Sequence, residues 1–188
     1  MTSPTDRKGD WYMTWQGRRF WPWDPRPEDV DIDVIAHHLA RICRFNGAVK
    51  VEHYSVAQHS IIVSQLVPDD MAFMGLMHDA AEAYCGDQIR PNKVGLPDFQ
   101  QLEARIWAAV AAKFKLPLEL PPEVKDADNI ALVTERRDVM PQAQFEWSST
   151  LDCYRPRPEP IKAMSAVAAE LAFMGRFYEL SEMNPSDT

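Results

Sequence analysis

The sequence has few cysteines, no paired cysteine motif and no long apolar run. Its three cysteines, Cys43, Cys85 and Cys153, are widely spaced. This pattern argues against a disulfide framework and against a zinc ribbon, and it indicates a reducing compartment. No apolar run approaches the roughly 20 residues that a membrane helix needs, and the N-terminus has no apolar signal region. We therefore expect a soluble, cytoplasmic protein with no membrane partner.

Basic side chains are also scarce. The chain has 20 Lys and Arg residues against 28 Asp and Glu residues, which gives a formal net charge of −8. An acidic surface argues against a nucleic-acid polymer as partner, but a local basic pocket could still bind a small anion. With 188 residues, of which 46% are hydrophobic, the chain is long enough for one domain with a substantial core.

Most of the chain carries apolar positions at helical spacing. Asp31 and Ser55 are expected to be the N-caps of the first two helices, and Ser55 with Gln58 forms a capping-box pattern. The spacing predicts helices over these ranges: 32 to about 45, 56 to about 67, 71–86, 98–114 with Asp98 as N-cap, 122–140, and about 161–180. Residues 87–93 are expected to be a loop and 141–160 an irregular segment. Since no buried-strand pattern occurs, we expect an all-α helical bundle.

The N-terminal segment is an aromatic exception. Trp11–Trp15 and Arg18–Trp21 flank Gly17 and predict a small β-hairpin. The hairpin could be a flap that packs on the helical body or on another subunit, or a lid that stacks on a nucleobase. We favour packing, because aromatic clusters usually pack. The aromatic front and the apolar last helix also favour a homodimer or a larger homo-oligomer.

The most informative stretch runs from Met71 to Asp87 and is apolar on nearly every side, so as a helix it would be buried. It nevertheless carries His78, Asp79 and Glu82. Buried ionisable groups are costly unless they are paired or bind a metal ion. We therefore expect His78 and Asp79 to bind a metal, with Glu82 one turn further along to orient a water molecule or pass its proton.

Two further potential ligands lie on other predicted helices. His59 falls on the first buried turn after Val56, and Asp128 lies close to the inward face of the helix that begins at Pro122. Two imidazoles and two carboxylates suit one divalent transition ion, such as Co, Mn, Zn, Ni or Fe, better than Mg, which stays possible. The alternative is an accidental His-Asp pair, but its apolar helix and the two partners favour a metal site.

Cationic side chains are expected near this site. Arg44 ends an earlier helix and Lys93 lies in the loop after the central stretch. Both could hold phosphate oxygens, Arg44 with a bidentate fork. In contrast, His37 and His38 have no partner at ligand spacing and His53 precedes its helix, so we expect these three to be structural or surface residues.

At these residues the sequence resembles the HD-domain superfamily of metal-dependent phosphohydrolases, whose pattern is H…HD…D. The match is closer still to the bacterial 5′-deoxynucleotidase branch, and a phage-encoded dATP triphosphohydrolase is similar in the same places. The motif residues of that branch are matched by Arg44-Phe45, Gln58-His59-Ser60, His78-Asp79-Ala80, Glu82, Gly86-Asp87, Pro91, Lys93 and Asp128.

The resemblance implies a helical HD-domain bundle around one divalent metal ion. His59, His78, Asp79 and Asp128 would bind the metal. Asp79 and Glu82 would be the catalytic residues, with Glu82 assisting the attacking water.

The resemblance also implies a substrate site for a nucleotide. Arg44 and Lys93 would hold phosphate, and Lys125 is a further candidate. Asp87 would sit beside the sugar and disfavour a ribose 2′-hydroxyl. Phe45 stands where the branch usually has tryptophan and would pack on the sugar or the base.

The resemblance covers about Asp31 to Met140. The interval from His59 to His78 is short for the branch, so the connecting loop and any pocket wall built from it are reduced. We divide the chain into three parts: an N-terminal aromatic hairpin and connector (1–30), an HD-domain catalytic core (31–140), and an irregular segment with a C-terminal helix that packs on the core (141–188).

The expected function is phosphohydrolysis of a small-molecule (deoxy)nucleotide. The residues leave open a 5′-deoxynucleotidase and a dNTP triphosphohydrolase. Triphosphate chemistry needs more cationic groups, and the number of candidates does not decide between the two: Arg44, Lys93 and Lys125, with Lys50, Arg90 and Arg18 or Arg19 in reserve. A diiron oxygenase of the same fold is an alternative that would need additional histidines, of which three remain. A non-catalytic, metal-stabilised binding module is another, and the intact motif argues against it.

Overall fold

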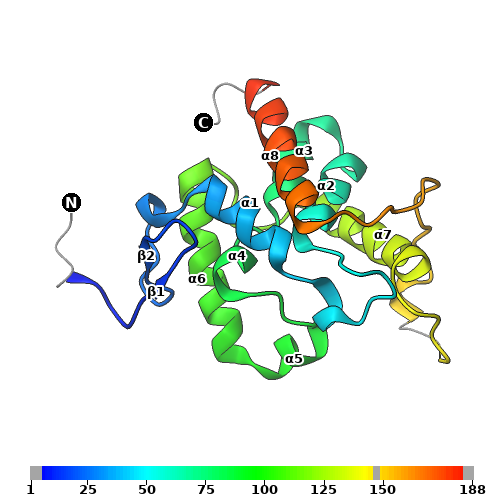
Figure 1. Cartoon of the computed structure of the whole chain (residues 1–188), viewed down its shortest axis with the longest axis horizontal. Coiled ribbons are helices and arrows are strands. Elements are labelled where there is room, and N and C mark those ends of the chain that lie inside the picture. Colours follow the sequence, from blue (N-terminus) through cyan, green and yellow to red (C-terminus); the bar gives the residue numbers. More distant parts are fainter. Residues whose placement is uncertain (1–5, 146–148, 184–188) are drawn as a thin grey trace.

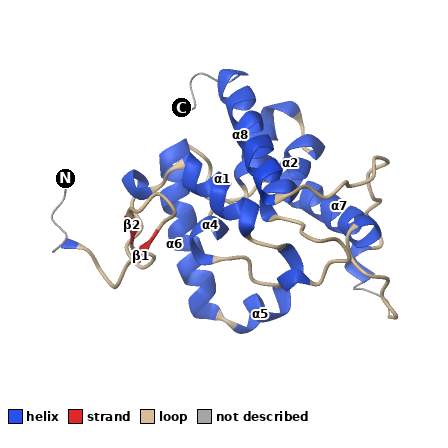
Figure 2. Cartoon of the chain, in the orientation of Figure 1, coloured by secondary structure: helices blue, strands red, loops and turns tan. Residues whose placement is uncertain are grey.

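The computed structural model describes residues 6–145 and 149–183, and it is mostly helical (Figure 1). One two-stranded antiparallel sheet lies near the N-terminus (Figure 2). These features confirm the prediction of an all-α fold with a small N-terminal hairpin. Within the described residues, no helix combines the length and the apolar character needed to cross a bilayer.

The hairpin consists of β1 (Tyr12–Met13) and β2 (Arg19–Phe20), with Tyr12 opposite Phe20. The turn between the strands contains Gly17, whose φ of 77° lies in the left-handed region that glycine adopts without steric cost. The predicted turn position is therefore correct.

The hairpin packs on the helical body. The Phe20 ring is fully buried and stacks on the Tyr84 ring, with centroids 4.2 Å apart. The Tyr12 hydroxyl donates a hydrogen bond to the Tyr84 carbonyl oxygen at 3.1 Å. Trp15 stacks on His37, again with centroids 4.2 Å apart. These contacts agree with the packing interpretation.

Residues 6–145 and 149–183 contain eight α-helices: α1 (Ile32–Arg41), α2 (Val56–Leu66), α3 (Ala72–Met77), α4 (Glu82–Cys85), α5 (Arg90–Gly95), α6 (Pro97–Phe114), α7 (Pro122–Asp138) and α8 (Ala166–Met183). Helix α2 packs against α1, α3, α7 and α8 (Figure 1). Its residues from Val56 to Ser64 are all buried, so its polar members must find partners inside the protein.

The N-caps predicted for the first two helices are confirmed. The Asp31 side chain accepts a hydrogen bond from the Asp33 N–H at 2.9 Å, and the Ser55 hydroxyl accepts one from the Gln58 N–H at 3.1 Å. Each cap satisfies an N–H group that the first turn of a helix leaves without a partner. The reciprocal half of the capping box is replaced, because the Gln58 amide instead bonds the backbone of Lys162 and Met164.

The first helix ends earlier than predicted, at Arg41 rather than near Phe45. The chain turns extended at Ile42 because it runs antiparallel beside the segment that precedes α2. The Arg44 N–H donates to the Tyr54 carbonyl at 2.9 Å, and the Val56 N–H donates to the Ile42 carbonyl at 3.1 Å. This long-range pairing places Arg44 beside α2.

The prediction of a single helix over 71–86 is also wrong. The chain forms α3 and α4 with a tight turn between them, in which the N–H groups of Ala80, Glu82 and Ala83 bond the carbonyl three residues earlier. His78 and Asp79 therefore lie in this α3–α4 turn rather than within a continuous helix.

Three other boundaries differ from expectation. Helix α6 begins at Pro97, so Leu96 and not Asp98 is the N-cap, and proline suits this first position because it needs no N–H donor. The segment predicted as a loop contains α5. Helix α8 begins at Ala166 rather than near Ile161, and the backbone before it is instead bonded by the Gln58 side chain at Lys162 and Met164.

Candidate metal centre

Two motif histidines are brought together by a close approach of α2 and α3. Gly75 lies at this contact, where a Cβ atom would be 3.0 Å from Val67 Cγ2 and 3.1 Å from Ser64 Cα. Its carbonyl oxygen also accepts a hydrogen bond from His78 Nδ1 at 2.8 Å. The absence of a side chain at Gly75 thus lets the His78 ring approach His59.

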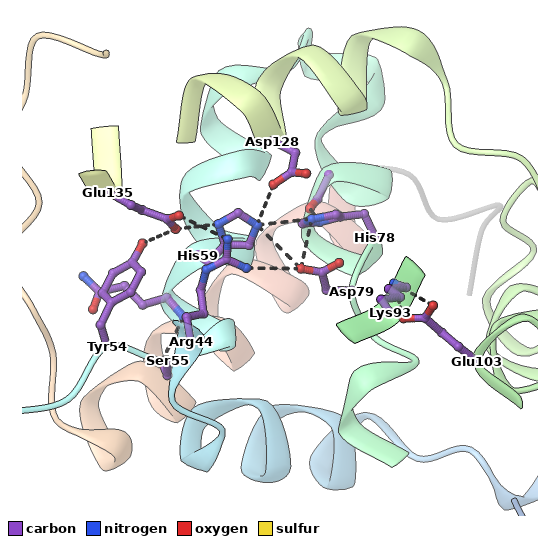
Figure 3. A network of polar contacts seen from close by, with 12 residues as sticks. Arg44, Tyr54, Ser55, His59, His78, Asp79, Lys93, Glu103, Asp128 and Glu135 are labelled. Atoms are coloured by element: carbon purple, nitrogen blue, oxygen red, sulfur yellow. Dashed lines mark hydrogen bonds and ion pairs between the residues drawn. The ribbon is translucent and has the colours of Figure 1, made fainter. Parts of the chain in front are cut away.

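Four potential ligands from three elements face one another in Figure 3. His59 Nε2 lies 3.3 Å from His78 Nε2 and 3.2 Å from Asp128 Oδ1. Asp79 Oδ2 lies 3.2 Å from His78 Nε2 and 3.5 Å from His59 Nε2. Ligand atoms of His59, His78 and Asp128 all lie within 4.8 Å of one another, so this cluster could hold a metal ion.

The chemistry of these donors fits a transition metal ion. Each ring has an acceptor for its Nδ1 proton: Gly75 O for His78, and Glu135 Oε1, at 2.7 Å, for His59. Because these oxygens accept hydrogen bonds, each neutral ring presents a lone pair at Nε2. Two such lone pairs beside two carboxylates form a site that attracts a cation.

The neighbours of His59 shift its pKa in opposite directions. Burial and the Arg44 charge lower the pKa of His59, but the carboxylates of Glu135 and Asp128 outweigh them and raise it to about 9. A metal ion that binds His59 Nε2 would therefore displace a proton at neutral pH.

Arg44 connects the cluster to a second buried carboxylate. Its guanidinium lies 3.8 Å from Asp79 Oδ2 and 3.1 Å from Glu135 Oε2. Burial by itself raises the pKa of Asp79, but His78, His59 and Arg44 hold it well below the usual range. Asp79 is thus ionised at neutral pH, as a metal ligand must be.

A cavity of about 760 Å³ opens beside the cluster, and most of the predicted site residues line it: Arg44, Phe45, Asp79, Glu82, Asp87, Lys93 and Asp128. Its wall also includes Arg90, which the sequence offers as a reserve cationic group, and residues that sequence reasoning did not assign, among them Gln88, Ile89, Asn129, Leu132 and Leu151. Lys125, in contrast, is exposed on α7 and is not one of the described lining residues.

Glu82 presents a buried carboxyl group to this cavity. It is 7% exposed, and its Oε2 atom has no hydrogen-bond partner among the described residues. Burial, together with the charges of Asp79 and Asp87, raises the pKa of Glu82 well above the usual range. A carboxyl with high proton affinity in a cavity can act in proton transfer.

Lys93 and Asp87 lie at the wall of the same cavity. Lys93 Nζ is 2.6 Å from Glu103 Oε1 on α6. Burial lowers the pKa of Lys93, but the Glu103 contact outweighs it and raises the pKa. Asp87 is half-buried, and burial raises its pKa despite the nearby Arg44. Lys93 is therefore a charged ammonium group that forms an ion pair with the Glu103 carboxylate.

Sequence reasoning missed Glu135, which lies to the left of the His59 ring in Figure 3, on the side away from His78. It is fully buried, and its Oε1 atom also accepts a hydrogen bond from the Tyr54 hydroxyl at 2.9 Å. A signal for it was present, because Glu135 follows Asp128 by two helical turns on α7 and so lies on the same face.

The remaining histidines have partners elsewhere, as predicted for structural residues. His37 Nδ1 lies 3.1 Å from Glu170 Oε1. His38 Nδ1 bonds the Ala83 carbonyl at 2.7 Å, and His53 Nε2 bonds the Ala40 carbonyl at 2.8 Å. Within the described ranges, none of the three joins the His59 cluster.

Comparison with known proteins supplies relatives for this chain. No model of a known protein family matches it. It is 39% identical over 170 residues to the uncharacterized protein YfdR of Escherichia coli (strain K12), and the matched stretch covers 90% of this chain and 95% of that protein. It is 34% identical over 164 residues to an uncharacterized protein of Rhodobacter capsulatus, and the matched stretch covers 82% of this chain and 83% of that protein. The chain therefore belongs to the protein family of Escherichia coli YfdR.

Proposed function

We propose that this protein is an HD-domain metal-dependent phosphohydrolase that acts on deoxynucleotides. The observation that supports this most strongly is the convergence of two histidines and two aspartates beside the 760 Å³ cavity, which Asp79 and Asp128 line. The cavity has the size of a small-molecule site. A buried carboxyl group and three cationic side chains also line the cavity, and groups of these kinds can transfer a proton and hold a phosphate.

One divalent transition ion would be held by the imidazole Nε2 atoms of His59 and His78 and by the carboxylates of Asp79 and Asp128. Such an ion polarises a phosphate oxygen and lowers the pKa of a water molecule. The protein side chains would supply the remaining functions, namely phosphate binding, proton transfer and recognition of the sugar and base.

Arg44 and Lys93 would hold phosphate oxygens. Both line the cavity, and both are tethered by a carboxylate, Arg44 by Glu135 and Lys93 by Glu103. Tethering fixes each charged group in place before substrate arrives, which lowers the entropy lost on binding.

Glu82 would take the proton of the attacking water. Its Oε2 atom has no competing hydrogen bond among the described residues. The charges of Asp79 and Asp87 contribute to the raised pKa of Glu82, so a cation that binds Asp79 would lower this pKa and leave Glu82 ionised, ready to accept a proton. As a proton-transfer group, Glu82 contributes to turnover rather than to metal binding.

The sugar and base would occupy the rest of the cavity. Phe45, Ile89, Leu132 and Leu151 supply apolar surface there. Asp87 lies on the same wall and would disfavour the extra hydroxyl of a ribonucleotide. A deoxynucleotide therefore suits the cavity better than a ribonucleotide.

The charges of the cavity favour a monophosphate. Among the described residues, Arg44, Arg90 and Lys93 are the cationic side chains that line it, and two of these are already paired with Glu135 and Glu103. A triphosphate carries more negative charge and needs more cationic partners. We therefore expect 5′-deoxynucleotidase activity to exceed triphosphohydrolase activity.

Product analysis tests this function. The protein would be stripped of metal, reloaded with Mn²⁺ or Co²⁺, and incubated with deoxy- and ribonucleoside mono- and triphosphates. Inorganic phosphate and a deoxynucleoside from a monophosphate are the expected products. A nucleoside and tripolyphosphate would instead identify a triphosphohydrolase. No turnover of any nucleotide by the metal-loaded protein would contradict the proposal.

A further inference from the structure

Glu135 is a fully buried carboxylate whose two oxygen atoms have different partners. Oε1 accepts hydrogen bonds from His59 Nδ1 at 2.7 Å and from the Tyr54 hydroxyl at 2.9 Å. Oε2 lies 3.1 Å from the Arg44 guanidinium. The Glu135 and His59 side chains both have 0% exposed surface, and the Arg44 side chain has 12%.

Three donors surround the Glu135 carboxylate. The Arg44 guanidinium, the His59 ring and the Tyr54 hydroxyl all contact its oxygen atoms, and the guanidinium supplies a positive charge. A buried charge is costly unless partners compensate for it, and removal of such a partner network is strongly destabilising. Glu135 is thus a fixed anion directly behind the metal-site cluster.

This anion determines how the His59 ring is oriented. Figure 3 shows the ring between Glu135 on one side and the other candidate ligands on the other side. With Nδ1 bound to Glu135, Nε2 faces Asp128 Oδ1 at 3.2 Å and His78 Nε2 at 3.3 Å. The ring therefore cannot rotate without breaking a buried, charge-assisted hydrogen bond.

We propose that Glu135 is a positioning residue of the metal centre, which fixes the Nδ1–H tautomer of His59 and so makes Nε2 a stronger metal ligand. This inference rests on the metal-binding part of the proposed function and not on the identity of the substrate. A carboxylate that accepts the second N–H of a metal-binding histidine orients the ring and raises its basicity.

The second oxygen atom of Glu135 extends this role to the cavity. It holds Arg44, whose Nη1 atom lies 3.8 Å from Asp79 Oδ2. One carboxylate therefore orients a metal ligand with Oε1 and a phosphate-binding cation with Oε2. Loss of the Glu135 charge should affect both groups together.

The chain offers a matched control at Glu170 on α8. Glu170 contacts a histidine and an arginine as Glu135 does, with distances of 3.1 Å to His37 Nδ1 and 2.7 Å to Arg41 Nη1. Its side chain is 24% exposed, and its histidine lies outside the His59 cluster. The same substitution at both positions separates a general loss of a Glu–His contact from an effect on the metal site.

The test compares Glu135→Gln and Glu170→Gln with the wild-type protein. The Kd for Co²⁺ would be measured on metal-stripped protein in the absence of nucleotide, together with the visible absorption of the Co²⁺ complex. We expect Glu135→Gln to raise the Kd by roughly 10- to 100-fold and to change the Co²⁺ spectrum. Glu170→Gln should match the wild type in both. A folded Glu135→Gln variant with wild-type Kd and spectrum overturns the inference.

A second measurement needs no variant, so it remains decisive if Glu135→Gln does not fold. In the ¹⁵N NMR spectrum of the Zn²⁺-loaded wild-type protein, we expect the His59 proton on Nδ1. A proton on Nε2, or a protein that binds neither metal, overturns the inference. Weakened Co²⁺ binding by Glu135→Gln without hydrolysis of any nucleotide by the wild type would support the inference while contradicting the proposed function.

Discussion

The Nε2 atoms of His59 and His78 lie 3.3 Å apart, and the Nδ1 atom of each ring is bound to a different acceptor. Glu135 accepts from His59, and the Gly75 carbonyl accepts from His78. Both rings are therefore turned with the same nitrogen toward Asp79 and Asp128. This arrangement underlies the proposed metal centre, because each ring can offer a lone pair only toward the cluster.

Loss of Asp128 should weaken metal binding. Asp128→Ala removes a carboxylate whose Oδ1 atom lies 3.2 Å from His59 Nε2, so we expect the Kd for Mn²⁺ or Co²⁺ to rise by at least about 10-fold. Calorimetric titration of metal-stripped protein measures this. The control is Asp126→Ala, two residues earlier on α7, where the carboxylate instead accepts a hydrogen bond from the Tyr154 hydroxyl. Equal Kd values for the two variants would contradict the ligand assignment.

Asp87 should control the choice of sugar. Asp87→Ala should reduce the preference for deoxynucleotides over ribonucleotides. We expect the ratio of their kcat/KM values to fall by about 10-fold, which corresponds to about 1.4 kcal/mol. The physical reason is the loss of a half-buried carboxylate on the cavity wall. The exposed Asp70 serves as a control through Asp70→Ala. An unchanged ratio in Asp87→Ala would remove Asp87 from the sugar site.

The docked hairpin should loosen in acid through His38. Its Nδ1 atom bonds the Ala83 carbonyl at 2.7 Å, which leaves Nε2 to accept from the Trp15 N–H at 3.3 Å. Burial lowers the pKa of His38, while the Ala83 hydrogen bond opposes this shift. Below pH 6.5 the unfolded chain then binds more protons than the folded protein. The free energy of unfolding should fall as the pH drops from about 6.5 to the pKa of the folded state, by at most about 1.4 kcal/mol per pH unit.

Urea titrations between pH 5 and 8 measure this effect on metal-stripped wild-type protein and on His38→Asn. The difference in unfolding free energy between the two proteins should shrink as the pH falls. The reason is that the wild type then loses the stabilisation that the neutral form of His38 supplies. Trp15 fluorescence should report the change, since its indole stacks on the neighbouring His37. A pH-independent difference would contradict the role given to His38.

Gly75 should be required for the contact between α2 and α3. In Gly75→Ala the new Cβ atom would meet Ser64 Cα at 3.1 Å, and this backbone atom cannot move without shifting the helix. We expect a loss of roughly 1–3 kcal/mol in unfolding free energy. Metal affinity should also fall, because the Gly75 carbonyl holds the His78 ring.

Gly175→Ala on α8 is the control for this substitution. A Cβ atom at Gly175 would have no heavy atom within 4 Å. Alanine has the higher helix propensity, so this variant should be up to about 1 kcal/mol more stable than the wild type. Equal unfolding free energies for the two alanine variants would contradict the close approach at Gly75.

Much of the fold and of the metal cluster could be predicted, because the relevant signals are local. Asp31 and Ser55 each cap a helix within three residues, and Gly17 fits the hairpin turn. His59, His78 and Asp128 carry ionisable groups on apolar faces, where only pairing or metal binding compensates for burial. Their convergence agrees with that reasoning.

The predictions that failed depend on contacts between distant segments. The first helix stops at Arg41 because residues 42–44 pair with the chain before α2, and α8 starts late, after backbone that Gln58 instead bonds at Lys162 and Met164. Glu135 was missed for a related reason. Its partners, His59 and Arg44, come from segments more than 70 residues away in the sequence, and helical spacing alone does not show which face they share.

The proposed catalytic role of Glu82 can be separated from metal binding. Glu82→Gln keeps the size of the side chain but removes a carboxylate that could take a proton. We expect this variant to bind Co²⁺ with wild-type affinity and to lower kcat by roughly 100-fold or more. Glu123→Gln, at an exposed position in the first turn of α7, is the control. Loss of the metal from Glu82→Gln would show that the role of Glu82 is different.

The measurement that tests the proposed function most directly is phosphate release from deoxynucleoside monophosphates. Metal-stripped wild-type protein would be assayed before and after addition of Mn²⁺ or Co²⁺, beside Glu82→Gln under the same conditions. We predict that phosphate release requires the metal and is greatly reduced in Glu82→Gln. A metal-loaded wild-type protein that releases neither phosphate nor tripolyphosphate from any nucleotide would contradict the assignment as a nucleotide phosphohydrolase.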